Sequence, residues 1–268
     1  MTLEEKALQL RRDIIEMLYK SQSGHPGGSL SCIDALVALY YNVMNVDPAN
    51  PRWEDRDRFV LSKGHCCPAL YAVLADKGFF PREELWTLRQ LGSHLQGHPD
   101  MRKTPGVDAN TGSLGQGISI AMGMALAAKH GGKGYKVYTM VGDGECQEGL
   151  VWEAAMAAAH YKLDNFTVIL DHNRLQIDGE NDKVMSLGSI CAKFASFGFD
   201  TYSVDGHSID AITLALNIPF TPGKPKFICC ETVKGKGVSF MENNAGWHGK
   251  APNDEQLAQA LKENMFLC

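Results

Sequence analysis

Three features that would each indicate a particular class of protein are missing from this sequence. No uninterrupted apolar run reaches the length of a membrane-spanning helix. The formal net charge is only −5 over 268 residues, so no overall charge draws the chain to nucleic acid or to an anionic membrane surface. The first residues, Met1–Lys6, are charged and typical of a helix start, not of a signal peptide. We therefore expect a cytoplasmic protein with neither nucleic acid nor membrane as a partner.

The sequence also lacks any C-x-x-C pair, although it contains eight cysteines. Four of them form two vicinal pairs, and vicinal cysteines are poorly placed to bridge to each other. The cysteines lie at two adjacent pairs and four single positions: Cys66-Cys67, Cys229-Cys230, Cys32, Cys146, Cys191 and Cys268. Buried, reduced thiols are the expected state, and neither a disulfide framework nor a cysteine metal site is indicated.

The order of predicted elements indicates an α/β fold in one domain, residues 1–268. With 44% hydrophobic residues the chain can bury a full core, and no linker or repeat marks a boundary. Strands are expected at 58–61, 137–141, 166–170, 201–204 and 226–232. Helices are expected at 3–19, 31–41, 68–77, 115–128, 148–161, 187–197, 209–216 and 255–263. This alternation predicts a doubly wound, mostly parallel sheet with helices on both faces.

Gly142-Asp143-Gly144, followed by Asn173, is the most informative motif. Asp143 ends one predicted buried strand and Asn173 ends the next, about 30 residues later, which is the length of one βαβ unit. Both side chains should then emerge at the carboxyl edge of a parallel sheet. A carboxylate and an amide oxygen suit a hard cation such as Mg²⁺, and the glycines allow close approach of a phosphorylated ligand. Alone, the tripeptide could also be a turn in which Asp143 caps the next helix.

This pairing resembles the thiamine diphosphate motif, in which Gly-Asp-Gly is followed one strand–helix–strand unit later by Asn. The resemblance implies that Asp143, Asn173 and the backbone carbonyl of Leu175 bind the metal ion. It implies Mg²⁺ as that ion, with Ca²⁺ or Mn²⁺ able to take its place. Gly142 and Gly144 would lie beside the cofactor diphosphate.

Further segments resemble transketolase, in the order in which that family has them, and they span residues 25 to 250. They are Ser23-Gly24-His25-Pro26-Gly27, Ser62-Lys63-Gly64-His65, Gly97-His98-Pro99, Thr111–Gly117, Lys234–Gly237 and Trp247-His248-Gly249. The implied fold is the diphosphate-binding domain of a thiamine diphosphate enzyme. The implied activity is transfer of a two-carbon ketol unit from a ketose (phosphate) donor to an aldose (phosphate) acceptor.

Ketol transfer requires protons to move among hydroxyls, and imidazole can donate or accept them near neutral pH. By resemblance His25 and His98 contact the donor, whereas His65 and His248 lie by the diphosphate and the acceptor hydroxyl. His25 and His98 each precede proline in a glycine-rich turn, so either residue alone could be a loop residue bonded to its own backbone. The other five histidines match no motif and are expected to be structural.

The resemblance implies more cofactor contacts around the same site. Gly112, Ser113 and Leu114 would lie against the cofactor rings, and Ser113 stands where the family often has proline, so this loop is less rigid. Lys234 would lie near the diphosphate, as would Lys63 unless it is a solvated loop lysine. Glu148 has two open explanations, because it could simply favour the helix dipole or, with Glu153, lie at a subunit interface.

The resemblance covers only the N-terminal part of a transketolase. In that family the glutamate that activates the aminopyrimidine comes from a pyrimidine-binding domain, and this domain and the C-terminal domain are expected on a partner chain. The Met start and the capped final helix favour a natural split enzyme over a fragment. We expect the N-terminal subunit of a two-gene transketolase, in a heterotetramer with two copies of each chain.

Two other functions stay open on the residues alone. One is a subunit of another thiamine diphosphate enzyme, similar to 1-deoxyxylulose-phosphate synthase or to the α-subunit of a 2-oxoacid dehydrogenase. The paired Gly-His-Pro segments and Trp247-His248-Gly249 favour ketol transfer over these. The other is a non-catalytic assembly subunit that retains the cofactor fold.

Overall fold

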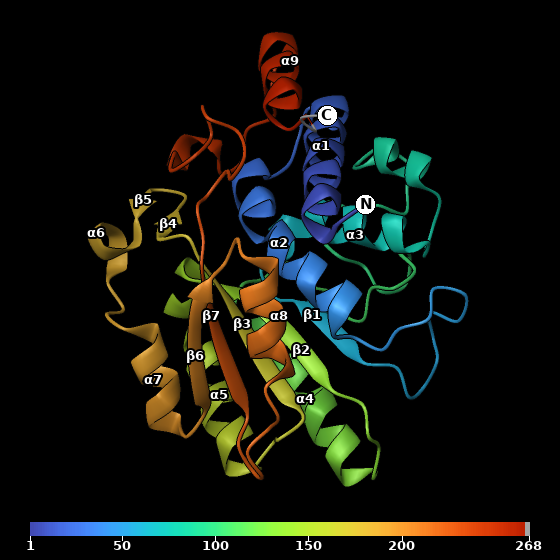
Figure 1. Cartoon of the computed structure of the whole chain (residues 1–268). Helices are drawn as coiled ribbons and strands as arrows, with labels where there is room; N and C mark the ends of the chain where they lie inside the picture. Colours follow the sequence, from blue (N-terminus) through green and yellow to red (C-terminus); the bar gives the residue numbers. More distant parts are fainter. Residues whose placement is uncertain (266–268) are drawn as a thin grey trace.

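Five parallel strands form the centre of the structure, a computed structural model that describes residues 1–265 (Figure 1). From one edge to the other the sheet runs β1 (Arg58–Leu61), β2 (Val137–Gly142), β3 (Phe166–His172), β7 (Lys226–Glu231) and β6 (Asp200–Asp205). All four pairings are parallel. A short antiparallel pair, β4 (Leu175–Gln176) and β5 (Gly179–Glu180), lies outside this sheet.

Helices cover both faces of the sheet. One side holds α2 (Pro26–Asn42) and α8 (Ile209–Asn217). On this side α1 (Leu3–Ser21) and α3 (Cys67–Lys77) pack against α2, and α9 (Asp254–Glu263) packs against α1 (Figure 1). The other side holds α4 (Gln116–His130), α5 (Gly149–His160) and α7 (Ile190–Phe197). The remaining helices are short: α6 (Asn181–Met185), η1 (Gly64–Cys66), η2 (Arg82–Thr87), η3 (Gly144–Gln147) and η4 (Ala245–Trp247). The predicted doubly wound fold is confirmed.

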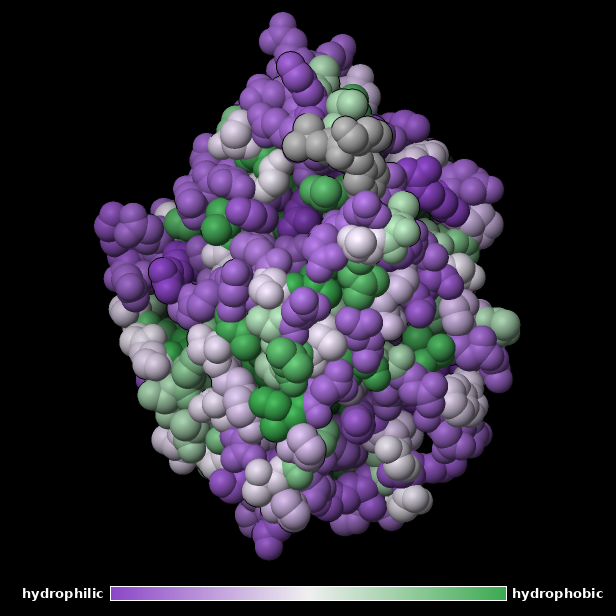
Figure 2. All heavy atoms as spheres, viewed as in Figure 1, coloured by the Kyte–Doolittle hydropathy of each residue, from purple (hydrophilic) through white to green (hydrophobic). Residues whose placement is uncertain are grey.

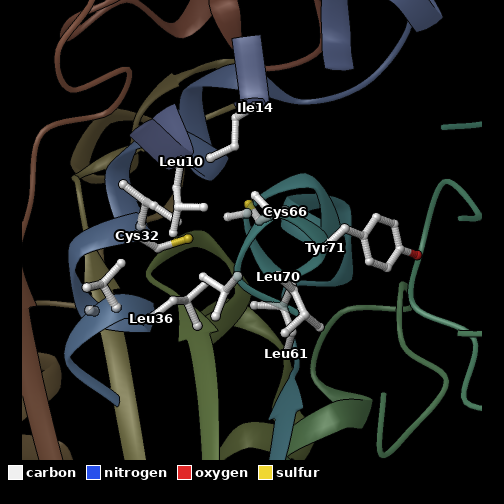
Figure 3. Close-up of a cluster of buried hydrophobic side chains, with 14 of the residues drawn as sticks. Leu10, Ile14, Cys32, Leu36, Leu61, Cys66, Leu70 and Tyr71 are labelled. Atoms are coloured by element: carbon white, nitrogen blue, oxygen red, sulfur yellow. The ribbon is translucent and has the colours of Figure 1, made fainter. Parts of the chain in front are cut away.

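The sheet separates two hydrophobic cores, because successive side chains of a strand point to opposite faces. Phe59 of β1 packs with the α1–α2–α3 side, whereas its neighbour Val60 packs with α4 and α5. On β7, Cys230 packs on the α1–α2–α3 side and its neighbour Cys229 packs on the side of α4 and α5. Figure 3 shows part of the first core, where Leu10, Ile14, Cys32, Leu36, Leu61, Cys66 and Leu70 gather and the ring of Tyr71 points away from them. Burial on both faces explains why the strands are continuous apolar runs.

All predicted strands and helices are present, but several boundaries differ. The second helix was expected from Ser31 and begins at Pro26, so Gly27 and Gly28 belong to its first turn. Proline suits that position because its φ is preset for a helix. Glycine is needed at 28 because a Cβ there would lie 2.6 Å from the Sγ of Cys66. The helix expected from 187 begins at Ile190, and the β4–β5 pair, α6 and η2 were not predicted.

The cysteine thiols agree with the sequence-based expectation as far as the structure describes them. Its seven cysteines are free, and six of them are buried; Cys268 lies outside the described residues. None of the helices between residues 1 and 265 is both long and apolar enough to cross a membrane. Hydrophilic residues cover most of the face in Figure 2, and hydrophobic ones gather near its middle, over α8.

A buried ionic network joins α1, α2 and the segment before α8. The guanidinium of Arg11 donates to the carboxylate of Asp34 at 2.5 Å, and Nδ1 of His207 lies 2.8 Å from the same carboxylate. Nε2 of His207 accepts from the backbone amide of Val233 at 2.9 Å. Burial raises the pKa of Asp34, but the charges and hydrogen bonds of Arg11 and His207 together outweigh it, so this pKa lies below its usual value.

Replacing Arg11 with Met should strongly destabilise the fold. The change leaves the buried Asp34 carboxylate without its cation, which costs about 3–5 kcal/mol in comparable buried pairs. Arg12→Met is the matched control, because Arg12 donates only a 3.4 Å hydrogen bond to the carbonyl of Leu261, a loss of about 1 kcal/mol or less. Urea denaturation measures both; equal stability of the two variants would contradict the assigned role of Arg11.

Candidate functional site

Asp143 and Asn173 lie at the same edge of the sheet, as predicted. Gly142 of β2 is paired in register with Asp171 of β3, so Asp143 and Asn173 leave the sheet from neighbouring strands. Both side chains are buried, with 4% of Asp143 and 8% of Asn173 exposed. The strand order, with β2 beside β3 in the middle of the sheet, brings them together.

The oxygens of these residues accept hydrogen bonds from backbone amides in the structure. The carboxylate of Asp143 accepts from the amides of Gly144, at 2.8 Å, and of Arg174. Oδ1 of Asn173 accepts from the amide of Leu175 at 3.1 Å. The carbonyl of Leu175 accepts from Nζ of Lys234 at 3.1 Å. The turn from 173 to 175 is therefore held against both Asp143 and Lys234.

The electrostatics of this edge suit a bound cation. Burial raises the pKa of Asp143, and the negative charge of Asp171 raises it further. A divalent cation next to Asp143 would offset both effects, because it attracts the charged form of the carboxylate. Carboxylate, amide and carbonyl oxygens are the donors that Mg²⁺ prefers. The residues present therefore fit the predicted ion.

Lys63 and Asp171 form a buried ion pair beneath this edge. Only 2% of the Lys63 side chain is exposed, and its Nζ donates to Asp171 at 2.6 Å and to the carbonyl of Gly28 at 3.0 Å. Burial lowers the pKa of Lys63, but the charge and hydrogen bond of Asp171, together with the nearby thiols of Cys32 and Cys66, raise this pKa well above its usual value. Lys63 is thus not a solvated loop lysine, the alternative that the sequence left open. The role of Asp171 was missed; its place at a strand end beside Asn173 was the available signal.

Glu145 is a second residue whose role the sequence did not reveal. Its buried carboxylate accepts from the amides of Gly115 at 2.9 Å and Gly142 at 3.0 Å, and from the Ser62 hydroxyl at 2.5 Å. The same hydroxyl accepts from the amide of Ile118 at 3.1 Å. Burial raises the pKa of Glu145. This carboxylate joins the ends of β1 and β2 to the loop before α4, and its position directly after Gly142-Asp143-Gly144 was the only signal.

Three of the four predicted catalytic histidines form a cluster. The ring centroids of His25, His65 and His248 lie 5.1 to 5.4 Å apart. His98 is exposed and lies beside this cluster, with its ring next to Gly112, where a Cβ would approach the ring to 2.9 Å. Motifs far apart in the sequence therefore meet at one place.

Desolvation favours the neutral form of His25, His98 and His248. It lowers the pKa of His25 to about 4, with a further contribution from His65. It lowers the pKa of His248 to about 3, with a further contribution from the Lys234 cation, whose Nζ lies 3.1 Å from Nδ1 of His248. Burial also lowers the pKa of His98, as does the charge of Arg89. Each lowered pKa follows from desolvation of the charged form.

The cluster and the Asp143 edge share one cleft of about 360 Å³. The predicted site residues that line it are His25, His65, Gly112, Leu114, Gly142, Asp143, Gly144, Glu148, Asn173, Leu175, Lys234 and His248. Lys63, Glu145 and Asp171 line it as well. Ser113 is exposed, and neither it nor His98 is among the described lining residues.

Two details show room for a ligand in this cleft. Nδ1 of His25 is buried and has no hydrogen-bond partner among the described residues. A Cβ on Gly142 would meet nothing closer than Lys63 at 3.7 Å, so packing within the described chain does not require glycine there. An unpaired buried nitrogen is costly unless a bound molecule satisfies it, and the missing side chain at 142 leaves space for that molecule.

The position of Glu148 agrees with the helix-dipole explanation, one of the two that the sequence allowed. It is the N-cap residue of α5, where a negative charge is favoured by the helix dipole, yet its side chain makes no capping hydrogen bond. Both Glu148 and Glu153 are exposed in the structure, so their predicted place at a subunit interface stays a prediction.

Comparison with known proteins identifies relatives of this chain. Residues 4–266 match the family described as "Transketolase, thiamine diphosphate binding domain". The chain is 47% identical over 263 residues to one of the subunits of the apulose-4-phosphate transketolase of Phocaeicola vulgatus, covering 98% of this chain and 93% of that protein. It is 45% identical over 262 residues to the 6-deoxy-6-sulfo-D-fructose transketolase subunit SqwG of a Clostridium species, covering 97% and 95%.

Longer transketolases match over the same region. Human transketolase is 38% identical over 268 residues, which cover 98% of this chain and 42% of that protein. The crystal structure of transketolase from Campylobacter jejuni superposes with a TM-score of 0.93 at 35% identity, covering 98% of this chain and 43% of that one. The chain therefore spans less than half the length of these transketolases and nearly the whole length of the separate subunits.

Replacing Lys234 with Met should raise the pKa of His248 from about 3, because removal of the neighbouring cation removes one of the two main causes of its depression. Lys236→Met is the control, since Lys236 pairs with Glu242. NMR titration of the histidine ring signals measures both variants. An unchanged His248 titration in Lys234→Met, or an equal shift in the control, would contradict this electrostatic account.

Proposed function

This chain belongs to the transketolase family, and we propose that it is the N-terminal subunit of a split transketolase dependent on thiamine diphosphate and Mg²⁺. Residues 1–268 would constitute one diphosphate-binding domain. The observation that carries the proposal is the shared cleft, in which the His25–His65–His248 cluster and the Asp143–Asn173 edge face the same space. The match to relatives of the same length supports the split arrangement.

The chain's own residues would hold the cofactor at its diphosphate end. Asp143, Asn173 and the carbonyl of Leu175 would bind Mg²⁺, with Ca²⁺ or Mn²⁺ as substitutes. Lys234 and His248 would bind diphosphate oxygens, and Gly142 and Gly144 would let the diphosphate approach the backbone. When bound, thiamine diphosphate supplies the carbon nucleophile that carries the two-carbon unit.

Further contacts would extend from the diphosphate towards the rings of the cofactor. His65 would contact the diphosphate from the histidine cluster, and Glu148 would line the cofactor side of the cleft. Gly112, Ser113 and Leu114 would lie against the rings. Gly112 has a φ of +140°, a conformation that glycine adopts without strain.

The histidines would move protons among the substrate hydroxyls. An imidazole with a lowered pKa is neutral at neutral pH, so it has one nitrogen that donates and one that accepts. His25 and His248 meet this condition. His25 and His98 would bind the donor ketose, and the unpaired Nδ1 of His25 would accept a hydrogen bond from it. His65 and His248 would serve the hydroxyl of the acceptor.

A partner chain would complete the site. It would supply the pyrimidine-binding domain with the activating glutamate and the groups that hold the sugar phosphate, in a heterotetramer with two copies of each chain. Exposed apolar side chains on α4 and α5, Ile120, Leu150 and Met156, lie on the elements that also carry Glu148 and Glu153. This mixed surface is suited to a subunit interface. We expect the assembly to act in the cytoplasm on ketose and aldose phosphates.

The chain should be inactive alone and active when mixed with its partner, because half of the cofactor site would be missing. Ketol transfer is measured with a ketose phosphate donor and an aldose phosphate acceptor, in the presence of thiamine diphosphate and Mg²⁺. Full activity of the isolated chain would contradict the split site. Pyruvate consumption without ketol transfer would indicate a different thiamine diphosphate reaction.

Asp143→Asn should lower the Mg²⁺-dependent activity of the complex by about 100-fold or more, since a loss of about 3 kcal/mol of metal and cofactor stabilisation corresponds to that factor. Asp178→Asn is the control, because Asp178 is an exposed carboxylate at the rim of the cleft. Binding of thiamine diphosphate with Mg²⁺, measured by calorimetry, should weaken only in Asp143→Asn. Undiminished turnover of that variant would favour a non-catalytic assembly role.

A further inference from the structure

A second group of potential metal ligands lies next to Asn173 and takes no part in the proposed function. His172 ends β3 and Glu231 ends β7, and the two residues are paired in register. Nδ1 of His172 lies 3.1 Å from Oε1 of Glu231 and 3.7 Å from Sγ of Cys229. Sγ of Cys229 lies 3.5 Å from the same Oε1. A nitrogen, a sulfur and an oxygen thus face one another at the carboxyl end of two neighbouring strands.

We propose that His172, Cys229 and Glu231 bind a zinc ion. Tetrahedral zinc has bonds of about 2.3 Å to sulfur and about 2.0 Å to nitrogen and oxygen. These lengths place sulfur about 3.6 Å from nitrogen or oxygen, and nitrogen about 3.3 Å from oxygen. The observed separations of 3.7, 3.5 and 3.1 Å agree with these values within the tolerance of about 0.2 Å expected of a real site. The ligand atoms would hardly have to move.

Three protein ligands leave one position of a tetrahedral zinc ion for water. His172 belongs to β3, and Cys229 and Glu231 belong to the neighbouring β7. No sequence pattern indicated that they meet, because residue 172 is distant from 229 and 231 in the chain.

The remaining oxygen of Glu231 is already held. Oε2 accepts from the guanidinium of Arg174 at 2.8 Å, whereas Oε1 lies 3.5 Å from Sγ of Cys229; both oxygens lie 3.1 Å from Nδ1 of His172. Ligating carboxylates are commonly oriented by a hydrogen bond to their other oxygen. Arg174 would also offset part of the negative charge that a thiolate and a carboxylate bring to the ion.

An ion can reach this group from solvent. The side chains of His172 and Glu231 are 25% and 39% exposed, and His172 lines an open cavity of about 500 Å³ together with Leu187 and Ile190. Asp143 and Asn173 line another part of this cavity, but their oxygens suit Mg²⁺, whereas sulfur and imidazole favour zinc. The two sites would therefore select different metals.

Zinc at this position would join the ends of β3 and β7 beside the cofactor cleft, because His172 belongs to β3 and Cys229 and Glu231 belong to β7. A bound ion would thus brace the segment that leads directly into Asn173. Binding requires a deprotonated thiol, so the affinity should fall as the pH is lowered.

The test is metal binding by the full chain, purified with a chelator, kept reduced and supplied with excess Mg²⁺. Zn²⁺ titration by calorimetry should give one tight site per chain. Co²⁺ should occupy the same site and produce the thiolate-to-cobalt charge-transfer band in the near ultraviolet. This band distinguishes a sulfur site from Co²⁺ held by the oxygens around Asp143.

Cys229→Ala and Glu231→Gln should each weaken Zn²⁺ binding by about 100-fold or more, since even losing a group that only orients a ligand costs about 10- to 100-fold. Cys230→Ala is the matched control, because Cys230 is an equally buried thiol on the same strand but faces the opposite core. Its metal binding should equal that of the unaltered chain.

Folding of each variant is checked by its circular dichroism and its thermal midpoint without metal. Glu231→Gln keeps the size of a half-exposed side chain, so it tests the site even if Cys229→Ala fails to fold. Absence of stoichiometric Zn²⁺ binding would overturn the proposal. So would a cobalt spectrum without the charge-transfer band, or unweakened binding in Glu231→Gln.

Discussion

The buried ion pair of Lys63 and Asp171 is the interaction on which the candidate site depends. Asp171 at the end of β3 accepts from Lys63, from the hydroxyls of Ser31 on α2 and Thr232 after β7, and from the side-chain amide of Asn173. Desolvating two charges is expensive unless their remaining hydrogen-bonding capacity is filled, and here the Asp171 carboxylate has four donors. The pair therefore holds the ends of β1, β3 and β7 and the start of α2 in one arrangement.

Burial at this edge has opposite consequences for groups of opposite charge. It raises the pKa of Asp143 and Glu145, and it lowers the pKa of His25 and His248. Both shifts have the same cause, since a charged form is less stable away from water. The cleft therefore has neutral imidazoles on one side and, on the other, buried carboxylates that a bound cation would stabilise. This arrangement suits a metal–diphosphate group that lies next to side chains able to transfer protons.

The strands and the Asp143–Asn173 pairing could be predicted because each rests on a local signal. A buried parallel strand is a continuous apolar run, and the spacing of one βαβ unit brings consecutive strand ends to the same edge. The roles of Lys63 and Glu145 could not be predicted. Asp171, the partner of Lys63, lies 108 residues away in the chain, and Ser62, a partner of Glu145, lies 83 residues away. No local sequence pattern indicates such contacts.

Order and spacing in the amino-acid sequence were sufficient for the fold class, for the resemblance to transketolase and for most, but not all, of the residues that line the cleft. Only the tertiary structure decided which polar groups are buried and which are paired. It showed that Lys63 is an ion-pair partner, that α2 begins at Pro26, and that His172 lies against Cys229. The physical reason is that secondary structure follows from neighbouring residues, whereas desolvation and pairing depend on segments that meet only when the sheet assembles.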